Sequence, residues 1–312
     1  MDVIHFPDDP RPPTWRSPVL ALGNFDGLHR GHLKIIERIQ RGATERAGTS
    51  VVLTFDPHPP RVLRPDKAPQ LLMTKPQKID ALQRAGVQGA AIVRFTREMS
   101  QWEPEAFVRN VLVEWLRVAE VWVGADFLFG RERSGNFTLL RSLGVQYGFR
   151  AEKIDPIRYK DFVVSSTRIR RLVGEGRVDE AGALLGHHYA IDGLVVEGAK
   201  RGREIGFPTA NLKTDNELMP PNGIYATAIT IDGQVYPSAT SIGQNPTFGD
   251  NLATTIEAHV IGQSMDLYGK TVRLAFVQRL RDERKFPDVE ALTEQISADV
   301  RRATRLFDRL SV

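Results

Sequence analysis

The chain has 312 residues, 41% hydrophobic and 26% charged, with a net charge of +4 and no cysteine. This composition excludes collagen-like and low-complexity classes, and the lack of cysteine excludes disulfides and thiolate metal sites. Apolar runs fall short of the roughly 18 residues of a membrane span, and the N-terminus lacks the pattern of a signal peptide, so we expect a cytoplasmic protein.

Apolar runs alternate with helical patterns up to about residue 185. The runs are typical of strands buried on both faces and lie at 17–22, 50–55, 89–95, 119–123 and 149–154. The apolar faces of the two clearest helices are formed by Leu33, Ile36, Ile39 and Ala43, and by Phe107, Val111 and Trp115. Ser100 and Glu103 have capping-box spacing before the second helix. The alternation predicts a Rossmann-like domain over residues 1–185, with ligands bound at the carboxyl ends of a parallel sheet.

A loop rich in glycine and histidine follows the first of these strands. It reads Gly23, Asn24, Phe25, Asp26, Gly27, Leu28, His29, Arg30, Gly31 and His32. Free amides at a helix start attract anions, and glycine lets a phosphate approach the backbone. His29 and His32 share a helix face and can bracket the phosphates of a nucleotide. Two surface histidines beside a tight turn are the alternative.

Three other segments fall near the same rim. Ser166 and Thr167 begin a predicted helix whose hydroxyls and amides can hold phosphate, and Arg168 adds positive charge there. A simple cap with a solvated arginine is the alternative. The segments 54–59 and 124–130 follow strands, and their aromatic and acidic residues can line the pocket of an organic substrate. Alternatively, their Pro and Gly residues only shape loops.

In this order, the motifs resemble the adenylyltransferase half of the prokaryotic bifunctional riboflavin kinase/FMN adenylyltransferases, also called FAD synthetases. The resemblance implies in-line attack of the FMN phosphate on the α-phosphorus of ATP, without a covalent enzyme intermediate. It implies that His29 and His32 stabilise the transferring phosphate and that Ser166, Thr167 and Arg168 stabilise the departing pyrophosphate. Further implied contacts are Gly23, Asn24, Phe25, Asp26 and Gly31 to the nucleotide, and Asp56, His58 and Asp126 to the flavin. Leu128 stands where many relatives carry Arg.

After residue 186 the pattern changes to strands without intervening helices. They are predicted at 191–197, 224–231, 235–241, 254–261 and 272–280, and Asp232-Gly233 is a strong hairpin signal. Helical spacing returns at Val289, Leu292, Ile296, Val300 and Phe307. We therefore expect a second domain over 186–312, a small antiparallel barrel closed by a C-terminal helix, joined to the first domain by a short helix at 178–185.

Two features of this second half carry chemistry. The loop 198–211 is rich in glycine and basic residues, so its amides can wrap a polyphosphate, and a neighbouring hydroxyl can bind Mg²⁺. It lacks the order of a P-loop, and a flexible surface loop is the alternative. Glu257 lies in an apolar strand, where an acid can simply face solvent.

The segments 206–211, 245–248, 266–269 and 280–286, together with Glu257, resemble the flavokinase half of the same family in order. The resemblance implies that Thr209 and Asn211 hold Mg²⁺ and the ATP phosphates. It implies that Glu257 takes the proton of the riboflavin 5′-hydroxyl and that Arg281 contacts the flavin. Further nucleotide contacts are implied for Gly202, Gly206 and Pro208.

The sequence thus predicts an enzyme that makes FMN from riboflavin and ATP, and then FAD from FMN and a second ATP, with Mg²⁺ at two separate sites. There are three alternatives: an enzyme active in only one half, a flavin-binding protein without turnover, and a basic regulatory protein that binds nucleic acid. Glu257 and the two loop histidines favour catalysis, because a pure binder needs no proton acceptor. The small net charge favours small-molecule partners over nucleic acid, and weak self-association is an open expectation.

Overall fold

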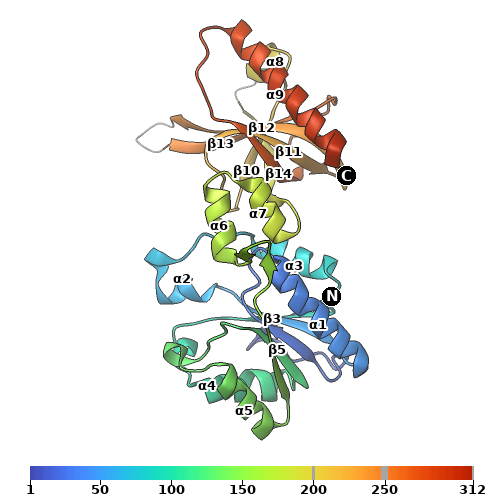
Figure 1. The fold of residues 1–312 in the computed structure, drawn as a ribbon, viewed down its shortest axis with the longest axis vertical. Coiled ribbons are helices and arrows are strands. Elements are labelled where there is room, and N and C mark those ends of the chain that lie inside the picture. The colour runs from blue at the N-terminus through green and yellow to red at the C-terminus, as the bar shows by residue number, and fades with distance from the viewer. Residues whose placement is uncertain (199–200, 247–251, 311–312) are drawn as a thin grey trace. The chain divides into compact units, whose positions relative to one another are not determined.

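The computed structural model describes residues 1–198, 201–246 and 252–310 (Figure 1). The contacts divide the chain into two compact units. The first unit contains Met1–Gln70 and Lys75–Ser165, and the second contains Leu71–Thr74 and the chain from Ser166 onward. The two predicted fold classes, a Rossmann-like sheet and a small antiparallel barrel with a C-terminal helix, are both confirmed.

A six-stranded parallel sheet forms the centre of the first unit. Its strands are β1 (Asp2–Phe6), β2 (Val19–Leu22), β3 (Ser50–Phe55), β4 (Gly89–Val93), β5 (Glu120–Gly124) and β6 (Arg150–Ile154). They are arranged in the order β1-β4-β3-β2-β5-β6, with every pair parallel. The chain runs from β2 outward to β3 and β4, and then crosses back to β5 and β6 on the other side of β2, which is the arrangement that opens a crevice at the strand ends.

Burial follows position in the sheet. β2 and β4 are buried at every residue, as the apolar runs predict. The prediction of two-faced burial is wrong for β6, which alternates between exposed and buried residues because it lies at the edge of the sheet. β1, which the sequence analysis did not single out, forms the other edge and pairs with β4.

Helices of the first unit pack on this sheet. They are α1 (Arg30–Glu45), α2 (Pro59–Leu63), α3 (Lys75–Arg84), α4 (Pro104–Phe107) and α5 (Phe137–Tyr147), with the π-helix η3 (Val108–Trp115) and the 3₁₀ turns η1 (Pro65–Lys67), η2 (Met99–Gln101) and η4 (Arg131–Arg133). A short antiparallel hairpin, β7 (Arg158–Tyr159) and β8 (Phe162–Val163), follows β6.

The capping box predicted at Ser100 and Glu103 is wrong. Ser100 lies in the 3₁₀ turn η2, and its hydroxyl donates to the Arg97 carbonyl oxygen at 2.6 Å. The helix begins later, at Pro104, after Glu103, whose side chain makes no capping hydrogen bond. Proline at the first helical position replaces the side-chain cap because it needs no partner for an N–H.

The second unit is a closed antiparallel barrel. Its strands are β9 (Tyr189–Val196), β10 (Ala210–Thr214), β11 (Gly223–Ile231), β12 (Gln234–Pro246), β13 (Leu252–Val260) and β14 (Thr271–Arg281), arranged in the order β10-β13-β12-β11-β14-β9. Asp232 and Gly233 form the predicted hairpin turn, both with positive φ. β10 is a strand within a segment that the sequence analysis treated as a loop, and it closes the barrel.

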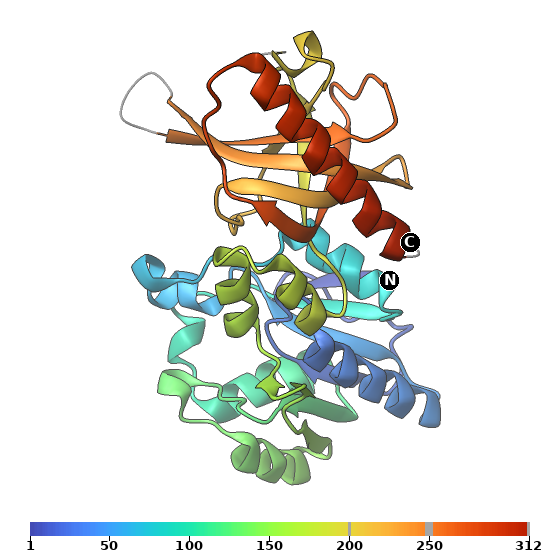
Figure 2. The same cartoon turned by 45° about the horizontal axis from the view of Figure 1, so that its top comes forward.

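Four helices complete this unit. They are α6 (Ser166–Gly174), α7 (Val178–Leu185), α8 (Arg201–Glu204) and α9 (Val289–Leu310). Figure 2 shows α9, in red, lying across the barrel, where Ala303 joins a buried cluster with Ala226, Val277 and Leu280. α7 and α9 are the predicted short and C-terminal helices.

Parts of two predicted motifs, Ala199-Lys200 and Thr247-Phe248, lie outside the described residues. Among the described residues, every helix is either too short or too polar to span a lipid bilayer.

Replacing Gly89 with Ala tests the packing at the start of β4. A Cβ there would overlap the ring of Trp15, which is 1% exposed and donates its indole N–H to Asp2 at 3.0 Å. Overpacking of this kind costs about 2–3 kcal/mol, so we expect Gly89→Ala to lower the free energy of unfolding of the first unit by about that much. Urea unfolding followed by tryptophan fluorescence measures it, and Gly124→Ala in the same unit is the control, because the nearest atom to its added Cβ is Asp126 Oδ1 at 3.4 Å.

Candidate active sites

The histidine loop connects the buried end of β2 at Leu22 to the start of α1 at Arg30. Its backbone takes positive φ at Phe25 (48°), Gly27 (88°) and Leu28 (40°). Such angles are strained for residues other than glycine, at about 1–3 kcal/mol each. The Phe25 and Leu28 side chains are buried, which holds the strained turn in place.

The two histidines of the loop are in contact. His29 is the N-cap residue of α1, and its Nδ1 accepts a hydrogen bond from the His32 backbone N–H at 3.3 Å. The His29 and His32 rings stack with centroids 3.6 Å apart, and Phe25 packs against His32 at 4.9 Å. Gly31 is required here, because a Cβ would come within 3.1 Å of the His29 ring. His29 therefore caps α1, and its ring lies directly against the ring of His32.

His32 is kept neutral by its surroundings. Its Nδ1 is buried and has no hydrogen-bond partner among the described residues. Burial lowers its pKa well below the ordinary value of 6.5, and the nearby charges of His29 and Lys78 lower the pKa further. A charged phosphate placed beside this ring would favour the protonated form instead.

Lys78 is a site residue that the sequence analysis missed. It projects from α3, and its Nζ donates to the Asn24 carbonyl oxygen at 2.9 Å, with Thr54 Oγ1 at 3.4 Å. One signal in the sequence could have pointed to Lys78. Thr74 followed by Pro76 marks a helix start, which places Lys78 one turn into that helix.

The other predicted residues of the first unit follow the ends of adjacent strands. Asp26 is 2% exposed in the loop after β2. After β3, Asp56 forms an ion pair with Lys75 at 2.9 Å and His58 is buried. After β5, Asp126 is exposed. Because β3, β2 and β5 are neighbours and parallel, these three loops open at one edge of the sheet. Leu128 is 43% exposed beside Asp126.

Ser166, Thr167 and Arg168 form the first turn of α6, as predicted, and belong to the second unit. This turn contains no acidic residue. A helix start with an arginine and two hydroxyls, and with no acidic residue, has the chemistry of an anion site.

The candidate kinase residues lie on one face of the barrel. Asn211 of β10 is directly opposite Glu257 of β13 in the strand register. The Thr209 hydroxyl donates to Glu257 Oε2 at 3.3 Å. Glu257 is half-buried between the buried residues Ile256 and Ala258, so it lies on the face opposite the core. A Cβ at Gly198 would overlap the Asn211 side chain, so glycine is needed beside it.

The loop before β10 wraps around the same face. The Gly202 carbonyl accepts the N–H of Phe207 at 2.8 Å, and Gly206 has a φ of 84° that glycine adopts without strain. The Pro208 carbonyl oxygen lies 2.9 Å from Nδ1 of His259, a neighbour that sequence reasoning did not select.

Arg281 has a strong partner within the protein. Its guanidinium forms an ion pair with Asp299 of α9 at 2.8 Å, with both side chains largely buried. This contact ties the end of β14 to α9. A flavin contact for Arg281 stays a prediction, and it would have to share the guanidinium with Asp299.

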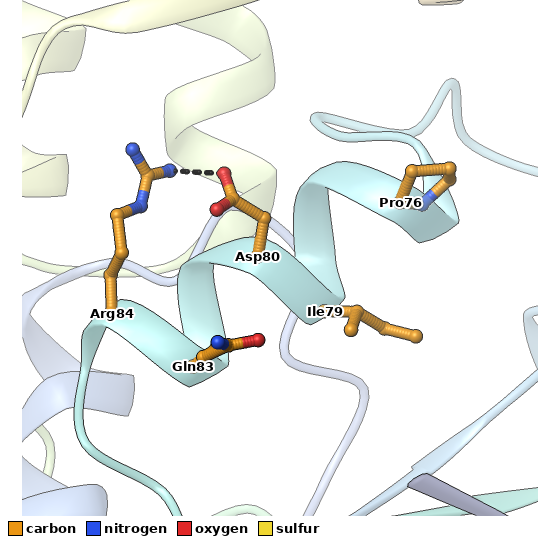
Figure 3. A pocket seen from close by; sticks show the side chains of 5 residues that line it. All are labelled: Pro76, Ile79, Asp80, Gln83 and Arg84. Atoms are coloured by element: carbon orange, nitrogen blue, oxygen red, sulfur yellow. Dashed lines mark ion pairs between the residues drawn. The ribbon is translucent and has the colours of Figure 1, made fainter. Parts of the chain in front are cut away.

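A hollow of about 580 Å³ lies on α3, lined by Pro76, Ile79, Asp80, Gln83 and Arg84 (Figure 3). Asp80 and Arg84 are ion-paired across it at 2.8 Å. None of the residues that the sequence predicted for the sites is among these five.

Comparison with known proteins covers nearly the whole chain. A sequence model of a family described as FAD synthetase matches residues 11–168, and one described as riboflavin kinase matches residues 185–307. The bifunctional riboflavin kinase/FMN adenylyltransferase of Escherichia coli K12 is 35% identical over 93% of this chain and 92% of its own length. That of Bacillus subtilis strain 168 is 36% identical over 94% and 93%.

Among solved structures, the crystal structure of a protein from Streptococcus pneumoniae named macrolide-efflux protein is similar throughout. The TM-score is 0.88 at 28% identity, covering 97% of this chain and 99% of that one. The two chains therefore share the same sequence of elements from end to end.

The neutral state of His32 can be measured directly. We expect its ring resonances to titrate well below pH 6.5 by NMR, with His32→Gln identifying them, and Lys78→Met to shift the midpoint upward because one repulsive charge is removed. Because the pKa is depressed on folding, stability from this group is present above pH 6.5 and is lost as the pH falls toward the folded pKa. A midpoint at or above 6.5 would contradict the burial of this ring.

Proposed function

The chain belongs to the family of bifunctional riboflavin kinase/FMN adenylyltransferases, and from this premise we propose how its residues divide the work. The protein phosphorylates riboflavin with ATP to FMN, and then adenylylates FMN with ATP to FAD and pyrophosphate. We assign adenylylation to the parallel-sheet unit and phosphorylation to the barrel. The observation that carries this division is the stacked His29–His32 pair on one unit and the Thr209–Glu257 pair on the other. We set the domain boundary at 185/186, which fits the riboflavin kinase match beginning at residue 185.

In adenylylation, His29 and His32 act on the transferring phosphate. The FMN phosphate attacks the α-phosphorus of ATP in line, and negative charge increases on the oxygens around that phosphorus. Two imidazoles stacked at a helix start offer N–H donors there, and the approach of the phosphates raises their affinity for protons. A neutral His32 before binding avoids the cost of burying a positive charge beside Lys78.

The remaining contacts of this half complete the assignment. Ser166, Thr167 and Arg168 hold the departing pyrophosphate, which suits a helix start that carries two hydroxyls and an arginine and has no acidic residue in its first turn. Asp56, His58 and Asp126 contact the flavin. The nucleotide contacts are Gly23, Asn24, Phe25, Asp26 and Gly31.

In phosphorylation, Glu257 takes the proton of the riboflavin 5′-hydroxyl as that oxygen attacks the γ-phosphorus of ATP, and the bond from this phosphorus to the bridging oxygen breaks to release ADP. Its carboxylate is held by the Thr209 hydroxyl, which fixes its direction. Gly202, Gly206 and Pro208 bring backbone groups to the ATP phosphates, and Arg281 contacts the flavin. Phosphoryl transfer requires mainly positioning and charge compensation, so this set is sufficient.

Mg²⁺ is part of the proposal for both reactions. In the barrel, the oxygens of Thr209 and Asn211 are the hard ligands that Mg²⁺ prefers, and Gly198 leaves the space that the Asn211 amide occupies. The residues present therefore fit the ion. When bound, it would neutralise part of the charge on the ATP phosphates.

We also propose a cytoplasmic location, which agrees with a cysteine-free chain that uses ATP. We further propose that the protein self-associates weakly and that it binds no nucleic acid. Sedimentation velocity at low and high protein concentration measures the first of these properties.

Separate substitutions should separate the two activities. His32→Ala removes a donor to the transferring phosphate, so we expect FAD formation from FMN to fall about 10²–10³-fold and FMN formation to stay within twofold. Glu257→Gln removes the proton acceptor and should lower FMN formation about 10²–10⁴-fold while FAD formation from FMN persists. Chromatography of the flavins after incubation with ATP and Mg²⁺ measures both products.

Loss of both activities from either folded variant would contradict the two-site assignment. His5→Ala is the matched control, because it removes an imidazole from β1 without touching either site, and it should retain both rates.

Gly198→Ala tests the predicted metal ligand. The added methyl group must displace the Asn211 amide, so we expect FMN formation to need about tenfold more Mg²⁺ for half-maximal rate. FAD formation from FMN in the same preparation is the internal control. An unchanged Mg²⁺ requirement would exclude Asn211 as a ligand.

A further inference from the structure

Lys78 occupies a central place in the adenylylation half that none of the assigned contacts explains. It comes from α3, far along the chain from the histidine loop, and its Nζ donates to the carbonyl oxygen of Asn24. The same ammonium group lies 3.4 Å from the Thr54 hydroxyl, which itself donates to that carbonyl at 3.0 Å. Lys78 and Thr54 together hold one backbone carbonyl of a loop whose φ angles are strained at Phe25 and Leu28.

The charges around Lys78 are mixed. The carboxylates of Asp26 and Asp56 attract its ammonium group, whereas Lys75 repels it and already pairs with Asp56 at 2.9 Å. Asp26 is 2% exposed, so its charge is poorly screened by water. On the other side, the charge of Lys78 acts on His32. The ammonium group therefore lies within electrostatic range of both the acids and the histidine pair.

A site that receives phosphates has to compensate for acidic residues beside it. ATP and FMN are both anions, and two carboxylates at the same edge of the sheet would repel them. A lysine among these carboxylates offsets their charge, while its hydrogen bond keeps the loop backbone in the shape that presents the two imidazoles.

We propose that Lys78 is a positioning residue for adenylyl transfer: it fixes the Asn24 carbonyl of the histidine loop and offsets the carboxylates of Asp26 and Asp56, so that this loop can accept the phosphates of ATP. The inference rests on the proposed assignment of adenylylation to this unit. It adds a residue from a different helix to that site.

The test compares Lys78→Gln, which keeps a donor but loses the charge, with Lys78→Arg, which keeps the charge. Steady-state FAD formation from FMN is measured with the full-length protein. For Lys78→Gln we expect the KM for ATP to rise about tenfold or more, with a smaller fall in kcat, because compensation for an anion affects ground-state binding. Lys78→Arg should restore the KM to within a fewfold of the parent.

Lys153→Gln is the matched control, because it removes the same charge from an exposed side chain on β6 that lies over the Phe137 ring. It should leave the KM unchanged. All four tryptophans, Trp15, Trp102, Trp115 and Trp122, belong to the first unit, so their emission reports whether that unit is folded in each variant. Lys78→Met serves as the second neutral variant if Lys78→Gln loses the native emission.

If a folded neutral variant keeps the KM for ATP of the unsubstituted protein, the proposal is overturned. The same holds if Lys78→Arg raises this KM as much as Lys78→Gln does. If both neutral variants lose the native tryptophan emission, the role of Lys78 is purely structural, and the proposal is again overturned. His32→Ala distinguishes the two levels of inference. If that variant keeps FAD formation, the site assignment itself fails, whereas a neutral result at Lys78 alone removes only this residue.

Discussion

The parallel pairing of β2 with β3 on one side and with β5 on the other determines where the first site can form. Strands that run in the same direction end at the same edge, so the loops that follow these three strands open together. β2 is fully buried, which anchors the histidine loop at its origin. The strained turn at Phe25 and Leu28 then delivers His29 directly into the N-cap of α1. The strand pairing therefore places the residues of this candidate site beside one another.

The electrostatics of that edge are those of a site prepared for an anion. Burial lowers the pKa of His32, and the neighbouring His29, whose ring stacks on it, lowers that pKa further. Lys78 supplies a fixed positive charge that the acids Asp26 and Asp56 partly balance. In the proposed site, arriving phosphates would meet this lysine and a His32 ring that becomes a better proton acceptor as negative charge approaches. The capping role of His29 and its proposed catalytic role are compatible, because the cap uses Nδ1 and leaves the other ring nitrogen available.

The barrel brings its candidate residues together by a different kind of strand pairing. Antiparallel strands place neighbouring side chains opposite each other on one face, and the pairing of β10 with β13 sets Asn211 across from Glu257. The interior behind this face is closed by packing and by buried hydroxyls, where Thr227 contacts Thr240 at 2.7 Å. The strand pairing of each unit brings a different set of candidate residues together, and the proposed assignment of one reaction to each set builds on this difference.

The sequence by itself determined the two fold classes, most strands, the helix starts at α1 and α6, and the order of motifs that identified the family. These features are local: alternation of apolar runs, a turn of Asp232 and Gly233, and glycines next to histidines. It did not determine β10, because a short strand between a glycine-rich loop and polar residues becomes a strand only when β9 and β13 supply its hydrogen bonds. Nor did it reveal Lys78, which is 46 residues from His32 along the chain. Its role depends on the position of α3, and the pairing of Arg281 with Asp299 likewise depends on α9. Contacts between distant segments were decided only by the tertiary structure, since side-chain charge and hydrogen bonding act through space and leave no periodic trace in the sequence.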